Sequence, residues 1–176
     1  MIATVYHLTK VIQSIFERIG ILFRSLYYGL GMRHVKSCFI EKHFFTNCLE
    51  KISCGEVTSI RKRVKLLALN HTGCINISDY AIIGDDNTII SHHKITIGNG
   101  VLMGRKVVVT DLPVNGGREK GLKIGDNVWI GENVRIIGSL NIGDSAIIGA
   151  GALVTKDVPA NTIVAGIPAR VIKKIN

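Results

Sequence analysis

The chain has 176 residues, of which 47% are apolar and only 6% aromatic, and 19 are glycine. Its formal net charge is +9, and most of this excess lies before Cys74, where 11 Lys and Arg face 4 Asp and Glu. This length allows one domain with a substantial aliphatic core. The basic first half favours an anionic neighbour such as a membrane surface or an acidic substrate, or is only a solvated face. No nucleic-acid-binding motif accompanies the charge, which disfavours nucleic acid as a partner.

Residues 1–34 are expected to form an N-terminal unit. From Val5 to Leu30 apolar residues recur every three or four positions, which predicts an amphipathic helix over residues 3–32. Such a helix packs on the domain or in an oligomer, or else it lies on a membrane surface. Its apolar runs are too short to cross a bilayer, and the sequence shows no secretory cleavage signal.

Residues 35–74 are expected to form irregular early coils of the structure that follows. Fragments such as SCFIEKHFF and KISCGEV are strand-like but follow no regular period. Cys38, Cys48, Cys54 and Cys74 form no C-x-x-C pair and no metal-like grouping with histidine. We therefore expect reduced thiols and no bound metal in a cytoplasmic protein, located at the inner face of the membrane if the helix lies on lipid.

The segment 75–176 repeats with a period of six residues. This period does not fit an amphipathic helix, and it predicts short strands joined by tight turns in a parallel β-helix. Each strand would bury one aliphatic side chain on the axis, and glycine would serve corners where a side chain clashes or φ is positive. The aliphatic positions are Ile77, Ile83, Ile89, Ile97, Met103, Val109, Ile124, Ile130, Ile136, Ile142, Ile148 and Val154.

Three stretches, IGDNVWIG, IGAGALVTKDVP and AGIPARVIKKI, carry a family resemblance. The chain resembles the hexapeptide-repeat acyltransferases, which include serine acetyltransferases and the O-acetyltransferases of sugars and surface polysaccharides. The resemblance covers residues 75–176 well and residues 35–74 loosely. It implies an all-β fold, a left-handed parallel β-helix with three hexapeptides, about 18 residues, in each coil. It also implies a homotrimer with active sites in grooves between subunits, where acetyl-CoA binds as the acyl donor.

The same resemblance implies which residues contact acetyl-CoA. Small residues let the pantetheine arm approach the backbone, and basic side chains meet the nucleotide phosphates. The only tryptophan resembles a family position close to the reacting thioester. The alternative is that these residues serve only as corners, surface charge and packing. The implied donor-binding residues are Trp129, Gly149, Ala150, Gly151, Lys156, Arg170, Lys173 and Lys174.

The stretch VVVTDLPVNGG interrupts the repeat and departs from the family pattern. The resembling sugar O-acetyltransferases often read T-D-H-x-H or T-x-x-H-P here, and that histidine is their general base. This chain has Thr110 and Asp111 followed by Leu112, and no histidine follows. Transfer from a thioester to a hydroxyl needs a base, and a side chain that titrates near neutrality suits this best. Another residue must replace the histidine, or the chemistry is lost.

The nearest substitutes are His92 and His93, in TIISHHKITIG. With about 18 residues in a coil, His93 would lie one coil below Asp111, about 4.8 Å away, and His92 would lie below Thr110. Asp111 would then hold the imidazole of His93 in the correct tautomer, a recurrent catalytic arrangement. The alternative is that both histidines are surface residues in a two-residue bulge, because the neighbouring repeat positions are eight apart rather than six.

Several functions remain open from the sequence. The first is an acetyl-CoA-dependent O-acetyltransferase for a sugar or surface-polysaccharide precursor, with His93 or His92 as the base and Asp111 orienting it. The second is a serine acetyltransferase, although the large helical N-terminal domain typical of that family is absent. The third is a non-catalytic trimeric β-helix that has lost the usual histidine. A β-helix carbonic anhydrase is set aside, because it needs three metal-binding histidines across coils.

Overall fold

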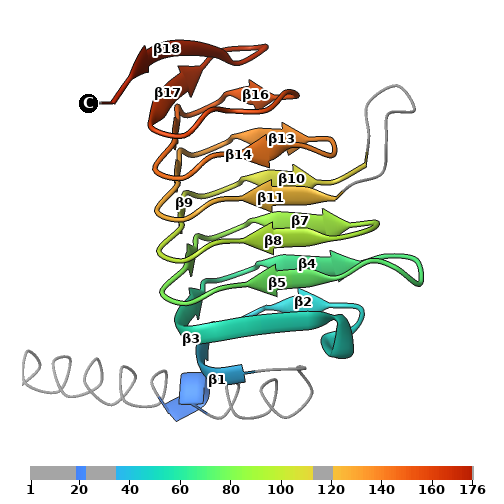
Figure 1. Cartoon of the computed structure of the whole chain (residues 1–176). Coiled ribbons are helices and arrows are strands. Elements are labelled where there is room, and N and C mark those ends of the chain that lie inside the picture. The colour runs from blue at the N-terminus through green and yellow to red at the C-terminus, as the bar shows by residue number, and fades with distance from the viewer. Residues whose placement is uncertain (1–18, 23–34, 113–120, 176) are drawn as a thin grey trace, which may run out of the picture.

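A computed structural model of the chain describes residues 19–22, 35–112 and 121–175. Short, mostly parallel strands and the turns between them stack into a β-helix, with β1 at one end and β18 at the other (Figure 1). The predicted parallel β-helix is therefore confirmed. The helix expected over residues 3–32 lies outside the described residues, except for residues 19–22, which are helical. No helix among the described residues has the length and apolar character that a membrane span requires.

The strands form three faces of the β-helix. The first face holds β5 (Ile75–Ile77), β8 (Ile95–Ile97), β11 (Leu122–Ile124) and β14 (Asn141–Ile142). The second face holds β6 (Ile82–Ile83), β9 (Leu102–Met103), β12 (Trp129–Ile130), β15 (Ile147–Ile148) and β17 (Thr162–Ala165). The third face holds β2 (Phe45–Thr46), β4 (Lys65–Ala68), β7 (Thr88–Ser91), β10 (Val108–Thr110), β13 (Arg135–Ile137) and β16 (Leu153–Val154).

The two ends of the stack differ from the regular coils. Strand β3 (Ile52–Ile60) pairs with both β5 and β6, so it runs along the first face and on to the second. Strand β1 (Val35–Ile40) pairs with β3, and a short 3₁₀ helix η1 (Leu49–Lys51) precedes β3. Strand β18 (Arg170–Lys174) closes the other end, antiparallel to β17. Residues 35–68 thus form strands of the same β-helix, with Ile40, Ile52, Ile60 and Leu66 fully buried.

The core is a column of aliphatic side chains along the axis. All twelve aliphatic repeat positions from Ile77 to Val154 are buried. The glycines that follow them allow close approach between coils: a Cβ on Gly84 would lie 2.5 Å from the carbonyl oxygen of Gly104. Positive φ also falls on polar corner residues such as Asn127 and Asn133 (φ 53° and 57°). Asparagine tolerates this left-handed conformation better than most residues.

The coils differ in length, and the extra residues gather at one corner. The coil from Arg135 to its partner Leu153 has the regular length of three hexapeptides. By contrast Lys65 pairs with Thr88, Thr88 with Val108 and Val108 with Arg135, so these three coils are all longer than the regular one. In each of them the extra residues lie between the third face and the first. We call this edge, formed by residues 69–74, 92–94, 111–112 and 121, the insertion corner.

Candidate active site

Asp111 is a fully buried carboxylate at the insertion corner. Its Oδ1 accepts a hydrogen bond from the backbone N–H of His92 at 2.7 Å. Its Oδ2 accepts from the backbone N–H groups of His93 and Lys94 at 2.9 Å and 2.8 Å, and from Ser91 Oγ at 3.3 Å. A buried carboxylate requires such partners, because unpaired it would cost several kcal/mol, on the order of 5. The carboxylate therefore holds residues 92–94 in place, and we call these residues the histidine turn.

His92 is the histidine whose ring faces this carboxylate. Its Nδ1 lies 3.4 Å from Asp111 Oδ1, and its side chain is 20% exposed. The Nδ1 atom is buried and has no hydrogen-bond partner in the part of the chain that the structure describes. A separation of 3.4 Å is longer than a good hydrogen bond. Catalytic hydrogen bonds in free enzymes are often long and shorten when substrate binds, so the pair can act as an imidazole with a carboxylate behind it.

The coil register differs from the one expected from regular hexapeptides. Thr110 pairs with Ile90 rather than with His92, so this coil is longer than the regular one. The next residue, Asp111, therefore lies one coil above Ser91. The expected stacking of His93 under Asp111 is therefore wrong, as is that of His92 under Thr110. Extra residues in the turn 92–94 shift the pairing by two positions. The turn brings the Asp111 carboxylate to the backbone of both histidines and to the ring of His92.

The next coil continues the site above Asp111. Ser139 Oγ donates to the backbone carbonyl of Asp111 at 3.1 Å. Gly121 has φ +79° and is buried where the inserted segment rejoins the first face, and a Cβ there would lie 2.5 Å from the carbonyl oxygen of Lys94. Only glycine fits this position, because the conformation and the close approach both exclude a side chain. The chain at Gly121 and Leu122 is therefore held close to the turn 92–94, where Leu122 N–H donates to the carbonyl of Lys94 at 2.8 Å.

A groove of about 460 Å³ runs along the first face beside the insertion corner. Its floor contains the buried side chains of Leu122 and Leu140. It begins at Lys94, next to the histidine turn, and crosses β8, β11 and β14 to reach Asp157. Three steps between parallel strands correspond to about 14 Å. Its lining residues are Lys94, Thr96, Gly121, Leu122, Lys123, Ser139, Leu140, Asn141 and Asp157.

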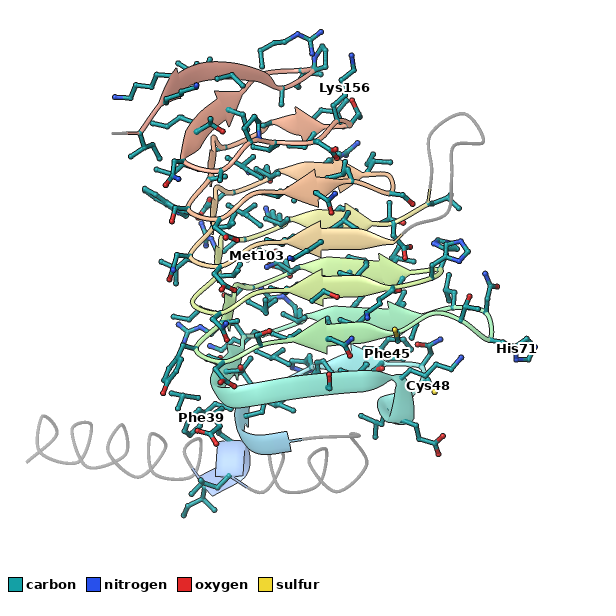
Figure 2. The ribbon with its side chains drawn as sticks, viewed as in Figure 1. Phe39, Phe45, Cys48, His71, Met103 and Lys156 are labelled. Atoms are coloured by element: carbon teal, nitrogen blue, oxygen red, sulfur yellow. The ribbon has the colours of Figure 1, made fainter. Side chains whose placement is uncertain are left out.

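The residues that the family resemblance implies for acetyl-CoA binding lie in different places on the surface of one chain. Lys156 precedes the groove-lining residue Asp157 in the chain, and Figure 2 shows it near the C-terminal end of the β-helix. Gly149, Ala150 and Gly151 lie at the corner between the second and third faces, because they connect β15 to β16. Arg170, Lys173 and Lys174 are exposed on β18, and Trp129 is exposed on β12 of the second face.

Trp129 belongs to an exposed apolar stripe along the second face. The strand register stacks it between Leu102 and Ile147, with Ile82 and Ile163 beyond them. Ile82 is 43% exposed, Leu102 46% and Trp129 57%. These side chains lie on a different face from the histidine turn. Within one chain, therefore, Trp129 and His92 are on different surfaces.

Sequence reasoning missed several residues of the site. Ser91, Ser139 and Lys123 were not singled out, because a single serine or lysine in a repeat gives no signal of its own. The segment 69–74 was also missed, because it precedes the first regular repeat, which begins at Ile77. No group of three or more His, Cys, Asp and Glu side chains is placed to hold a metal ion among residues 35–112 and 121–175.

Comparison with known proteins gives consistent matches. The family model for "Bacterial transferase hexapeptide (six repeats)" matches residues 121–156. WbbJ of Escherichia coli (strain K12), which is named as a putative O-acetyl transferase of lipopolysaccharide biosynthesis, is 30% identical over 85% of this chain and 91% of its own length. The galactoside O-acetyltransferase of the same strain is 44% identical over 51% of this chain. The chain spans only about half, 48%, of that relative.

A solved structure shares the architecture. A hexapeptide-repeat acetyltransferase of Vibrio cholerae O1 biovar eltor, complexed with acetyl coenzyme A, superposes with a TM-score of 0.55 at 25% identity, over 88% of this chain and 78% of the other. A parallel β-helix built from hexapeptide repeats is the architecture that this class of acyltransferases shares. With these matches, the chain belongs to the hexapeptide-repeat acyltransferase family.

Proposed function

We propose that this chain transfers the acetyl group of acetyl-CoA to a hydroxyl group of a sugar or surface-polysaccharide precursor. The observation that carries the proposal is the contact between His92 and the buried Asp111 at the insertion corner. An imidazole supported by a carboxylate is a suitable general base for a hydroxyl nucleophile. The sugar O-acetyltransferase names of WbbJ and of the galactoside relative support the acceptor class.

The chemistry follows from the arrangement of His92. Its Nε2 takes the proton of the acceptor hydroxyl as the oxygen attacks the thioester carbonyl, and Asp111 stabilises the imidazolium that forms. The new bond joins the acceptor oxygen to the acetyl carbon, and the bond from that carbon to sulfur breaks. The proton then passes from His92 to the leaving thiolate, which departs as coenzyme A. This route needs no metal and no covalent enzyme intermediate.

The groove on the first face suits the donor. Its length of about 14 Å is on the order of an extended pantetheine arm, and its floor of Leu122 and Leu140 is apolar. The thioester would lie at the Lys94 end beside the histidine turn. The nucleotide phosphates would lie at the other end, within reach of Lys156. Lys and Arg side chains are the usual partners of phosphate oxygens.

We further propose that the site is completed by a second copy of the chain in a homotrimer. Trp129 and its stripe on the second face are exposed and apolar in one chain, and such stripes mark interaction surfaces. A groove between subunits would bring the second face of one copy beside the insertion corner of the next. Trp129 would then come from the neighbouring subunit and cover the thioester. The same contact would remove Leu102 and Ile82 from water.

Serine is a second candidate acceptor, and a binding protein without turnover is a third candidate function. The experiment that separates them is thiol release from acetyl-CoA by the wild-type protein, with methyl galactoside, methyl glucoside, methyl rhamnoside or serine as acceptor. The proposal predicts release that depends on a glycoside, with the acetylated glycoside identified by mass spectrometry. Release with serine alone would instead identify a serine acetyltransferase. Tight acetyl-CoA binding without release for any acceptor would favour the binding protein.

A further inference from the structure

The connection between β4 and β5 is a polar projection at the insertion corner, one coil below the histidine turn. We call residues 69–74 the ledge. It has six residues where the next coil has three, and its exposed residues are Asn70, His71 and Thr72. Figure 2 shows His71 at the outer end of this connection, away from the body of the β-helix. These side chains lie outside the contact between His92 and Asp111 that carries the proposed acyl transfer.

The ledge is bonded directly to the histidine turn. Thr72 Oγ1 donates to the carbonyl oxygen of His92 at 2.9 Å, and the N–H of Cys74 donates to that of His93 at 3.1 Å. Gly73 closes the ledge on itself, because its N–H donates to the carbonyl of Leu69 at 3.1 Å. These bonds fix the position of the ledge relative to the candidate base. A fixed position is what a binding element for the reacting substrate requires.

The direction of the donor groove leaves the N-terminal side of the histidine turn for the acceptor. The groove runs from Lys94 toward the C-terminal end of the β-helix, so in the proposed function the thioester arrives from that side. The attacking hydroxyl has to reach His92 from a direction that the donor does not occupy. On the N-terminal side of the turn, the ledge is the structure that projects at this corner.

We propose that the ledge is the acceptor subsite, and that it binds a sugar ring next to the hydroxyl that is acetylated. This inference rests on the proposed function. An imidazole, an amide and a hydroxyl at Asn70, His71 and Thr72 offer both donors and acceptors to the hydroxyl groups of a sugar. Residues 69–74 carry no Asp or Glu, and Lys51 Nζ donates a hydrogen bond to the backbone carbonyl of Asn70 in the ledge. A neutral or anionic sugar therefore suits this surface, whereas the ammonium group of serine would find no carboxylate in it.

His71→Ala tests the ledge, with His71→Gln as the conservative variant. His71 is exposed, so its removal leaves the fold and the acetyl-CoA site in place. We expect KM for the methyl glycoside that gives the fastest thiol release to rise about tenfold, as the loss of about one hydrogen-bonding group in a subsite gives. We expect kcat and the KM for acetyl-CoA to stay within about twofold, and the Gln variant to recover part of the loss. Lys62→Ala, an exposed change at the corner between the second and third faces, is the matched control.

The outcomes separate the ledge from the proposed function. An unchanged glycoside KM in His71→Ala, while His92→Gln loses turnover, would overturn the ledge alone. A fall in kcat with no change in glycoside KM would also overturn it, since His71 would then act on the chemical step. No acetylation of any of the three glycosides by the wild type, while acetyl-CoA binds, would overturn the sugar acetyltransferase and the ledge with it.

Discussion

The carboxylate of Asp111 accepts a hydrogen bond from the backbone N–H of Lys94 at 2.8 Å, so a buried acid from one coil fixes the turn of the coil below. The same carboxylate accepts hydrogen bonds from the backbone N–H groups of the two histidines of that turn. It also lies 3.4 Å from Nδ1 of the His92 ring. Asp111 is thus a structural clamp for the turn and, in the proposed function, the partner of the base. The threonine-aspartate pair that precedes the missing family histidine keeps a defined structural role in this chain.

Asp111→Ala should lower both stability and activity. The substitution removes three hydrogen bonds to backbone N–H groups and leaves those groups without a partner, which costs about 3 kcal/mol. Asp111→Asn should cost less, about 2 kcal/mol, since one amide oxygen still accepts but the NH₂ group faces donors. Urea unfolding measures both. Asp144→Ala, which removes an exposed carboxylate that accepts a single backbone N–H, is the control and should cost about 1 kcal/mol. Equal losses for Asp111→Ala and Asp144→Ala would contradict the clamp.

Mixing two inactive variants should restore activity if the site is shared between subunits. His92→Gln lacks the base and Trp129→Ala lacks the proposed cover of the thioester, and each variant alone should be impaired. When they are co-expressed in equal amounts in a closed ring, about a quarter of the sites combine an intact His92 with an intact Trp129 from its neighbour. Glycoside acetylation by the purified mixed oligomer measures this. If the mixture only averages the two separate variants, the two residues do not meet across an interface.

Two of the four thiols should resist modification in the folded protein. A hydrogen bond with Cys38, together with burial, raises the pKa of the Cys54 thiol well above its ordinary value. Cys38 and Cys54 are buried, whereas Cys48 and Cys74 are half-buried. Because the thiolate is the reactive form, iodoacetamide should label Cys48 and Cys74 first and should label Cys54 only after unfolding. Mass spectrometry of the labelled peptides reads this out. Labelling of native Cys54 at the rate of Cys48 would show that the first coils open freely.

The repeat predicted the core of this fold because its period reports directly on which side chains point inward. All twelve aliphatic positions are buried as expected, from Ile77 to Val154. The early coils were harder to predict, because the long strand β3 turns a corner at Val57, with φ +55°, and a β-branched residue gives no turn signal at that position. A regular period identifies the axis of a solenoid but not the places where its coils lengthen.

The candidate site depends on those longer coils, and this limited the sequence prediction. The sequence placed His92, His93 and Asp111 in one neighbourhood, and the structure brings them together. The predicted stacking of residues within this group was wrong, because it assumed regular hexapeptides in a coil that is longer than three hexapeptides. The irregular step from Ile89 to Ile97 already carried that information. The ledge was missed for a similar reason: the extra residues before Ile75 precede the first regular repeat.

The central claim is that His92 is the base, and the most direct measurement is kcat/KM for glycoside acetylation by His92→Gln and His93→Gln beside the wild type. We predict that His92→Gln loses about a hundredfold or more, as removal of a general base does, while His93→Gln keeps most of the activity. The Kd for acetyl-CoA should be unchanged in both, which shows that the fold and the donor groove are intact. Wild-type kcat/KM in His92→Gln would contradict the claim, as would a hundredfold loss confined to His93→Gln.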